Sequence, residues 1–149
     1  MVINRISRPM QLNRFSSAVI FILVEEAKDL KVKDNAEMPT SHVVTKVGKH
    51  SHSGKECSKT ESPKWRAKSS FLLEKPHEET VKIKVKGTGH GILGSFILRI
   101  SDLLLAKNLT IEGWHQLEAP FPQGTIWIRF ELRILVPPRG PEFSMASSS

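Results

Sequence analysis

Strict alternation of apolar and polar side chains recurs along this chain and is clearest over residues 125–135, which read T-I-W-I-R-F-E-L-R-I-L. Every second residue from Ile126 to Ile134 is large and apolar, whereas the residues between them are Trp127, Arg129, Glu131 and Arg133. Because successive side chains of a β-strand point to opposite faces, this period predicts a strand with one buried face. Such a strand must cover its apolar face with another layer, which favours packed sheets.

Seven further segments have the length and composition of strands, although the polar segment 54–59 is the least regular of them. They are 18–24, 42–47, 54–59, 64–73, 81–86, 93–100 and 114–117. A short helix is predicted over 102–106, with Ser101 as its N-terminal cap. Eight strands at a spacing of roughly ten residues predict an all-β fold, an eight-stranded antiparallel β-sandwich with Greek-key connections.

The length of 149 residues is enough for one domain with a core of its own. We expect residues 17–136 to form that domain, residues 1–16 to be a basic flexible flank or linker, and residues 137–149 to be a disordered tail. Cys57 is the only cysteine, so no intramolecular disulfide can form and a reducing, cytoplasmic compartment is expected. The longest apolar run, 18–24, is far shorter than the ~20 residues of a spanning helix.

Positive charge is concentrated in the middle of the chain. The net formal charge is +7, and residues 42–100 alone hold 12 basic and 5 acidic residues, so their balance of 12 − 5 = +7 leaves the remainder neutral. Within this stretch, 81–86 reads V-K-I-K-V-K, which places the lysines on one face of a strand. Such a face suits an anionic membrane, a nucleic acid or an acidic protein. The alternative interpretation is that these lysines only discourage edge-to-edge aggregation.

Several motifs that would indicate an enzyme or a cofactor lack their context. Residues 89–94 match G-x-G-x-x-G, but a dinucleotide fold needs a helix after the glycines, and here a strand is predicted. His50, His52 and Cys57 lack a fourth ligand for a zinc site. No serine, histidine and carboxylate constellation can be placed, so neither catalysis nor a cofactor is expected. Nucleic-acid binding is not favoured, because the basic strands lack the interleaved aromatic side chains that stack on bases.

Five short segments together resemble a C2 domain, an eight-stranded membrane-docking sandwich. In chain order they are V-E-E-A-K-D-L at 24–30, V-V-T-K-V-G at 43–48, S-P-K-W at 62–65 with Ser69 and Phe71, I-L-G-S at 92–95, and W-H-Q-L at 114–117. The resemblance covers about residues 17–136 and is strongest to the C2 domains of the extended synaptotagmins. F-L-L-E-K-P-H at 71–77 and G-I-L-G-S at 91–95 carry that closer similarity.

The resemblance also implies what the loops should contain. Calcium-dependent members of the family supply about five aspartates from two loops, because this cation takes 6 to 8 oxygen ligands. Here Asp34 falls at the first of these positions, Thr40 replaces the acid at the second, and the third loop reads G-T-G-H-G at 87–91. One carboxylate cannot assemble the site. We therefore expect a calcium-independent domain with no bound metal, in which Asp34 is vestigial.

A membrane-docking surface is the second implication. In many C2 domains a basic patch on the third and fourth strands binds phosphoinositide headgroups without calcium. The matching positions, with an extension onto the fifth strand, are Lys55, Lys59, Lys64, Arg66, Lys68, Lys82, Lys84 and Lys86. We expect a peripheral module that binds anionic phospholipid within a membrane-tethering lipid-transfer protein, at contacts between endoplasmic reticulum and plasma membrane. The alternative is a protein-interaction domain, whose basic face meets an acidic protein or whose Trp127 packs against another C2 domain.

Overall fold

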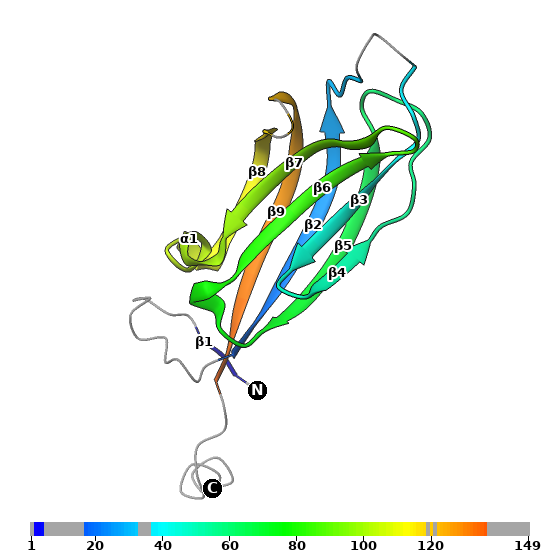
Figure 1. Ribbon diagram of the computed structural model, residues 1–149. Helices are drawn as coiled ribbons and strands as arrows, with labels where there is room; N and C mark the ends of the chain where they lie inside the picture. Colours follow the sequence, from blue (N-terminus) through cyan, green and yellow to red (C-terminus); the bar gives the residue numbers. More distant parts are fainter. Residues whose placement is uncertain (1, 5–16, 33–36, 119, 121, 137–149) are drawn as a thin grey trace, which may run out of the picture.

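Two antiparallel sheets pack face to face in the computed structural model, which describes residues 2–4, 17–32, 37–118, 120 and 122–136 (Figure 1). The first sheet has the order β1-β9-β2-β5, with β8 also paired to β9, and the second sheet has the order β4-β3-β6-β7. The strands are β1 (Val2–Asn4), β2 (Ser17–Lys28), β3 (Ser41–Val47), β4 (His50–Ser53), β5 (Lys64–Leu73), β6 (Thr80–Gly87), β7 (Gly91–Arg99), β8 (Thr110–Leu117) and β9 (Gln123–Val136).

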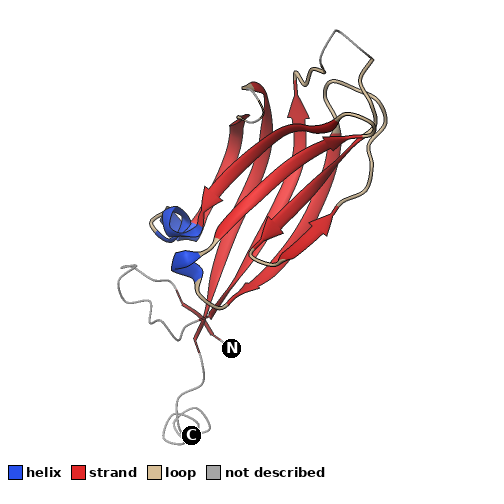
Figure 2. Cartoon of the chain, in the orientation of Figure 1, coloured by secondary structure: helices blue, strands red, loops and turns tan. Residues whose placement is uncertain are grey.

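Short helices lie together at one end of the sandwich, as the blue segments of Figure 2 show. They are η3 (Pro76–Glu78), α1 (Ile100–Leu104) and η4 (Lys107–Leu109). No helix within the described residues is long and apolar enough to cross a membrane. The chain passes repeatedly from one sheet to the other, since β3 and β4 follow β2, β5 returns to the first sheet, and β6 and β7 return to the second. The predicted β-sandwich is confirmed.

The core lies between the inner faces of the two sheets and follows from the alternation in the sequence. On β9, Ile126, Ile128 and Phe130 are completely buried, and on β6 the same is true of Val81, Ile83 and Val85. Two aromatic residues of β5 also contact this core: Phe71 is buried, while Trp65 is half-buried and donates its indole N–H to Ser41. Apolar burial of this kind, at about 25 cal/mol per Å², is the main force that holds the sheets together.

Three local predictions were wrong. Residues 54–59 are not a strand; the strand of this region is β4 at His50–Ser53, and Cys57 makes only an isolated bridge to Ser41. The helix begins two residues earlier than predicted, and Ser101 does not cap it; Arg99 holds the cap position without a side-chain hydrogen bond. Part of the predicted N-terminal flank is a strand, because Val2–Asn4 pairs with the end of β9. The rest of that flank, residues 5–16, and the predicted tail, 137–149, lie outside the described residues.

Candidate lysine surfaces and the loop ends

The outer face of the second sheet carries a compact group of lysines. In the β3–β6 register Lys46 is opposite Lys82, Val44 is opposite Lys84, and His42 is opposite Lys86. Because Val81, Ile83 and Val85 point into the core, the intervening lysines of β6 must point outward. We call Lys46, Lys82, Lys84 and Lys86 the lysine face. Lys46 and Lys82 are exposed, and Lys84 and Lys86 are partly covered.

The charge of the lysine face is not compensated within its own sheet. The four strands β3, β4, β6 and β7 contain no aspartate or glutamate at all. None of the four lysines forms an ion pair with any residue that the structure describes. Glu78 and Glu79 line a pocket of about 280 Å³ together with Lys46 and Lys82, at the end of the face. Burial raises the pKa of Glu79 above its ordinary value of 4.5, and the neighbouring Glu74 and Glu78 carboxylates raise it further.

A second basic group lies on β5, in the other sheet. Lys64, Arg66 and Lys68 alternate with Trp65 and Ala67 and are all exposed. Arg66 has a left-handed backbone with φ of 49°, at a bulge where β5 has one more residue than β2. Its guanidinium contacts the Glu25 carboxylate at 3.1 Å. We call Lys64, Arg66 and Lys68 the β5 basic strand.

Lys55 and Lys59 belong to neither group. Both lie in the segment between β4 and β5, and Lys59 approaches Glu37 at 3.8 Å. The predicted single patch is therefore divided into two outer faces and a connecting segment. β5 belongs to the first sheet and β6 to the second. Because the inner faces of the two sheets pack on each other, the exposed lysines of these strands point to opposite sides of the sandwich. Lys46, which completes the lysine face, was missed because residues 42–47 show no clear alternation and only the strand register reveals its place.

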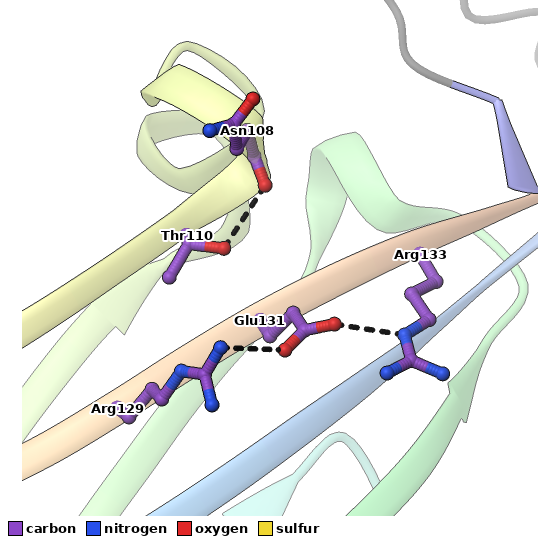
Figure 3. A network of polar contacts seen from close by, with 5 residues as sticks. All are labelled: Asn108, Thr110, Arg129, Glu131 and Arg133. Carbon is purple, nitrogen blue, oxygen red and sulfur yellow. Dashed lines mark hydrogen bonds and ion pairs between the residues drawn. The ribbon is translucent and has the colours of Figure 1, made fainter.

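Elsewhere on the first sheet, cationic side chains are balanced by acids. Glu131 accepts from Arg133 Nε at 2.8 Å and from Arg129 Nη2 at 3.1 Å, and the three side chains lie in a row along β9 (Figure 3). Arg133 also lies over the Phe21 ring at 4.5 Å. Four acidic residues lie on the strands of this sheet: Glu25, Glu26, Glu112 and Glu131. The first sheet is thus mixed in charge where the second is purely cationic.

Trp127, whose role was left open by the sequence, lies on the outer face of the first sheet. It is half-buried and directly opposite Trp114 in the β8–β9 register. Trp114 is 43% exposed, and the Lys28 ammonium lies over its ring at 4.5 Å. Lys28 and Trp114 therefore form a cation–π contact on this face.

At the loop ends, the described positions that the family resemblance marks for calcium ligands, Thr40 and the loop 87–91, carry no acidic residue. The hydroxyls of Thr40 and Thr88 are 2.7 Å apart, and the backbone N–H of Thr88 donates to the Thr40 carbonyl. Gly89 and Gly91 have φ of 78° and 66°, a left-handed conformation that glycine adopts without strain, and they turn the third loop. No group of three histidine, cysteine or acidic residues that could hold a metal occurs among the described residues. Asp34 lies outside them.

Calcium takes 6 to 8 oxygen ligands, largely carboxylates. Where the two loops meet in the described part of the chain, the contact is instead the hydroxyl pair of Thr40 and Thr88. Gln123, which sequence reasoning missed, further fixes this end of the sandwich: its buried side chain donates to the Leu93 carbonyl and accepts from the Lys31 backbone N–H. The sequence gives little sign of this role, because Gln123 is a single polar residue that precedes the alternating part of β9.

Comparison with known proteins identifies one family over most of the chain. The C2 domain family model matches residues 18–117. Extended synaptotagmin-1 from Homo sapiens is 34% identical over 134 residues, which are 90% of this chain and 12% of that protein. Extended synaptotagmin-2 from Mus musculus is 30% identical over 125 residues, 80% of this chain and 14% of that protein. The chain thus spans a small part of the length of these relatives.

Solved structures give the same result. A structure of extended synaptotagmin 2 that contains its SMP domain and two C2 domains superposes with a TM-score of 0.75 at 27% identity, covering 81% of this chain and 28% of that one. A calcium-bound structure of the two C2 domains of the same protein superposes with a TM-score of 0.73 at 26% identity, covering 82% of this chain and 44% of that one. The chain belongs to the C2 domain family.

Proposed function

We propose that this domain docks on anionic phospholipid bilayers without calcium, through the lysine face of the second sheet. One observation carries the proposal: a four-stranded sheet with no carboxylate presents four lysines on its outer face. The membership in the C2 family and the similarity to extended synaptotagmins support a membrane as the anionic partner. The place of action that we infer is the cytoplasmic side of a membrane contact between endoplasmic reticulum and plasma membrane.

The energy available is sufficient for reversible docking. A basic residue near an anionic leaflet contributes on the order of 1 kcal/mol, so the four lysines supply about 4 kcal/mol together. Because this attraction falls off within a Debye length, about 10 Å at 0.1 M salt, docking should weaken strongly as salt is added. No carboxylate of the same sheet competes with the lipid for these lysines.

Phosphoinositides suit the spacing of the lysines best. Neighbouring strands lie about 5 Å apart, and alternate residues of one strand about 7 Å apart. Lys46, Lys82 and Lys84 therefore form a small triangle on adjacent strands. A headgroup with several phosphates on one ring can contact two or three of these ammonium groups at once, whereas phosphatidylserine offers each of them a separate charge.

The loop ends support independence from calcium. The hydroxyl pair of Thr40 and Thr88 stands where the resemblance would place acidic ligands. Without those ligands the loops cannot recruit calcium to bridge the domain and lipid phosphates. We therefore propose that the charge of the lysine face acts alone.

Vesicle co-sedimentation tests this function. Binding should be absent with phosphatidylcholine alone, present with added phosphatidylserine, and stronger with phosphatidylinositol bisphosphate. It should be equal in calcium and in a chelator, and much weaker in about 0.5 M salt than in about 0.1 M. Failure to bind any anionic vesicle at low salt would refute the proposal, and a calcium requirement would refute its mechanism.

A protein-interaction role is the second candidate, and one feature favours it. The outer face of the first sheet exposes Phe21, Leu72 and Trp114, at 37%, 57% and 43%. Exposed apolar side chains on one face are typical of a docking surface for another protein. This role predicts that vesicle binding is absent, while the substitutions Phe21→Ser and Leu72→Ser disrupt a complex with another C2 domain.

A further inference from the structure

We propose that the domain binds anionic bilayers on both outer faces at once, so that a single copy bridges two membranes. The inference rests on the proposed function, since it takes the lysine face as the first docking surface. The second docking surface is the β5 basic strand together with the apolar side chains beside it. What the structure adds is the placement of the two surfaces on opposite sides of one sandwich.

The β5 basic strand has the features of a lipid-facing surface. Lys64 and Lys68 are exposed and have no ion pair within the described part of the chain. Leu72, at 57% exposure, continues the same face of β5, and the exposed Phe21 is opposite Ser70 in the pairing of β2 with β5. Basic side chains beside exposed apolar ones suit the boundary between headgroups and acyl chains, because each kind finds its preferred surroundings there.

The two surfaces cannot reach the same flat bilayer. The inner faces of both sheets are filled by the core, so the lysines of β5 and those of β6 point away from each other. Figure 1 shows β3 and β6 in one layer and β2, β5 and β9 in the other. A membrane that covers Lys82 and Lys84 therefore leaves Lys64 and Lys68 free to meet a second one.

The thickness of the sandwich makes bridging physically reasonable. Packed sheets are about 10 Å apart, and extended lysine side chains on both sides add to this separation. Two anionic bilayers held by the domain are thus more than one Debye length apart, about 10 Å at 0.1 M salt, so their mutual repulsion is largely screened. Each bilayer is meanwhile in direct contact with its own set of ammonium groups.

A clustering assay with charge-reversal variants tests the inference. Vesicles of phosphatidylcholine with phosphatidylserine and phosphatidylinositol bisphosphate are mixed with the protein, and clustering is followed by light scattering. One variant combines Lys46→Glu, Lys82→Glu and Lys84→Glu, and another combines Lys64→Glu and Lys68→Glu. The matched control combines Lys75→Glu and Lys107→Glu, two exposed lysines near the helical end. Circular dichroism verifies that each variant is folded.

Wild type and control should cluster vesicles. The variant at Lys64 and Lys68 should still co-sediment, with affinity reduced by roughly tenfold or less, but its clustering should fall at least tenfold. A mixture of the two variants should not restore clustering, because bridging needs both faces on one molecule. Restoration by the mixture would instead indicate bridging by a dimer and would overturn the inference.

Two further outcomes separate this inference from the proposed function. If wild type co-sediments with vesicles but does not cluster them, the bridging inference is wrong and the proposed docking function stands. If wild type neither binds nor clusters, the proposed function itself fails and the inference falls with it. Clustering by the Lys64 and Lys68 variant at the wild-type level would also refute the role of the β5 basic strand.

Discussion

Replacing Lys82 by glutamate should change membrane binding and folding stability in opposite directions. Lys82 is exposed on β6 and directly opposite Lys46 of β3. The substitution removes one attraction to the anionic leaflet and adds one repulsion, each of about 1 kcal/mol. The sum of about 2 kcal/mol corresponds to a loss of roughly 30-fold in apparent affinity for vesicles.

Stability should instead increase slightly. Like charges directly opposite on adjacent strands are destabilising, and opposite charges stabilise by a few tenths of a kcal/mol. Both side chains are exposed, so solvent screening keeps the gain from replacing the Lys46–Lys82 repulsion near 0.5 kcal/mol. For a domain of this size that corresponds to a rise of about 2 °C in melting temperature.

Co-sedimentation and thermal denaturation of the same preparation measure the two effects together. Lys107→Glu is the matched control, because it makes the same change of charge on an exposed residue far from the lysine face. It should leave vesicle affinity within about twofold of wild type. The reasoning is refuted if Lys82→Glu binds vesicles as well as this control does, or if it lowers the melting temperature by several degrees.

Three further predictions concern calcium and pH. Calcium at about 1 mM should leave the melting temperature the same as in a chelator. A ligand raises the melting temperature only of a folded protein that binds it, and we expect this domain not to bind calcium. Glu79→Gln should raise the melting temperature at neutral pH. Burial raises the pKa of Glu79 in the folded state above its unfolded value of 4.5, so ionisation of this carboxyl costs stability as pH rises through the folded pKa. Glutamine cannot ionise, and its advantage should vanish near pH 4. His115 stacks on Phe96 at 4.6 Å, and burial lowers its pKa. The stability that neutral His115 contributes is therefore complete above its unfolded pKa of 6.5 and is lost as pH falls through the lower folded pKa. Phenylalanine does not titrate, so His115→Phe should reduce the drop in melting temperature between about pH 7 and about pH 5.

Strands with one buried face could be predicted closely from the sequence. β5 and β6 differ from their predicted bounds, 64–73 and 81–86, by at most one residue at either end. Their alternation states directly which side chains are buried, so the core residues Ile83 and Phe130 were also predictable. Period two is a physical consequence of the pleated backbone, and it needs no knowledge of the rest of the fold.

β4 could not be predicted in this way, for a reason visible in its sequence. His50–Ser53 is polar at every position and exposed on both sides, so it has no period to read. It exists because Gly48, with φ of 59°, makes a two-residue turn that directs the chain back along β3. Its stability comes from pairing with a neighbour rather than from an apolar face of its own.

The division of the basic residues into two surfaces depends on information that alternation does not contain. Alternation assigns Lys64 and Lys68 to one face of a strand and Lys82 and Lys84 to one face of another. It cannot say that β5 is in the first sheet and β6 in the second, because long-range pairing decides this. Once the pairing is known, the basic residues are seen to form two separate surfaces. The cationic sheet is the one whose strands lack carboxylates, and the β5 lysines lie across the core from it, on the opposite outer face of the sandwich.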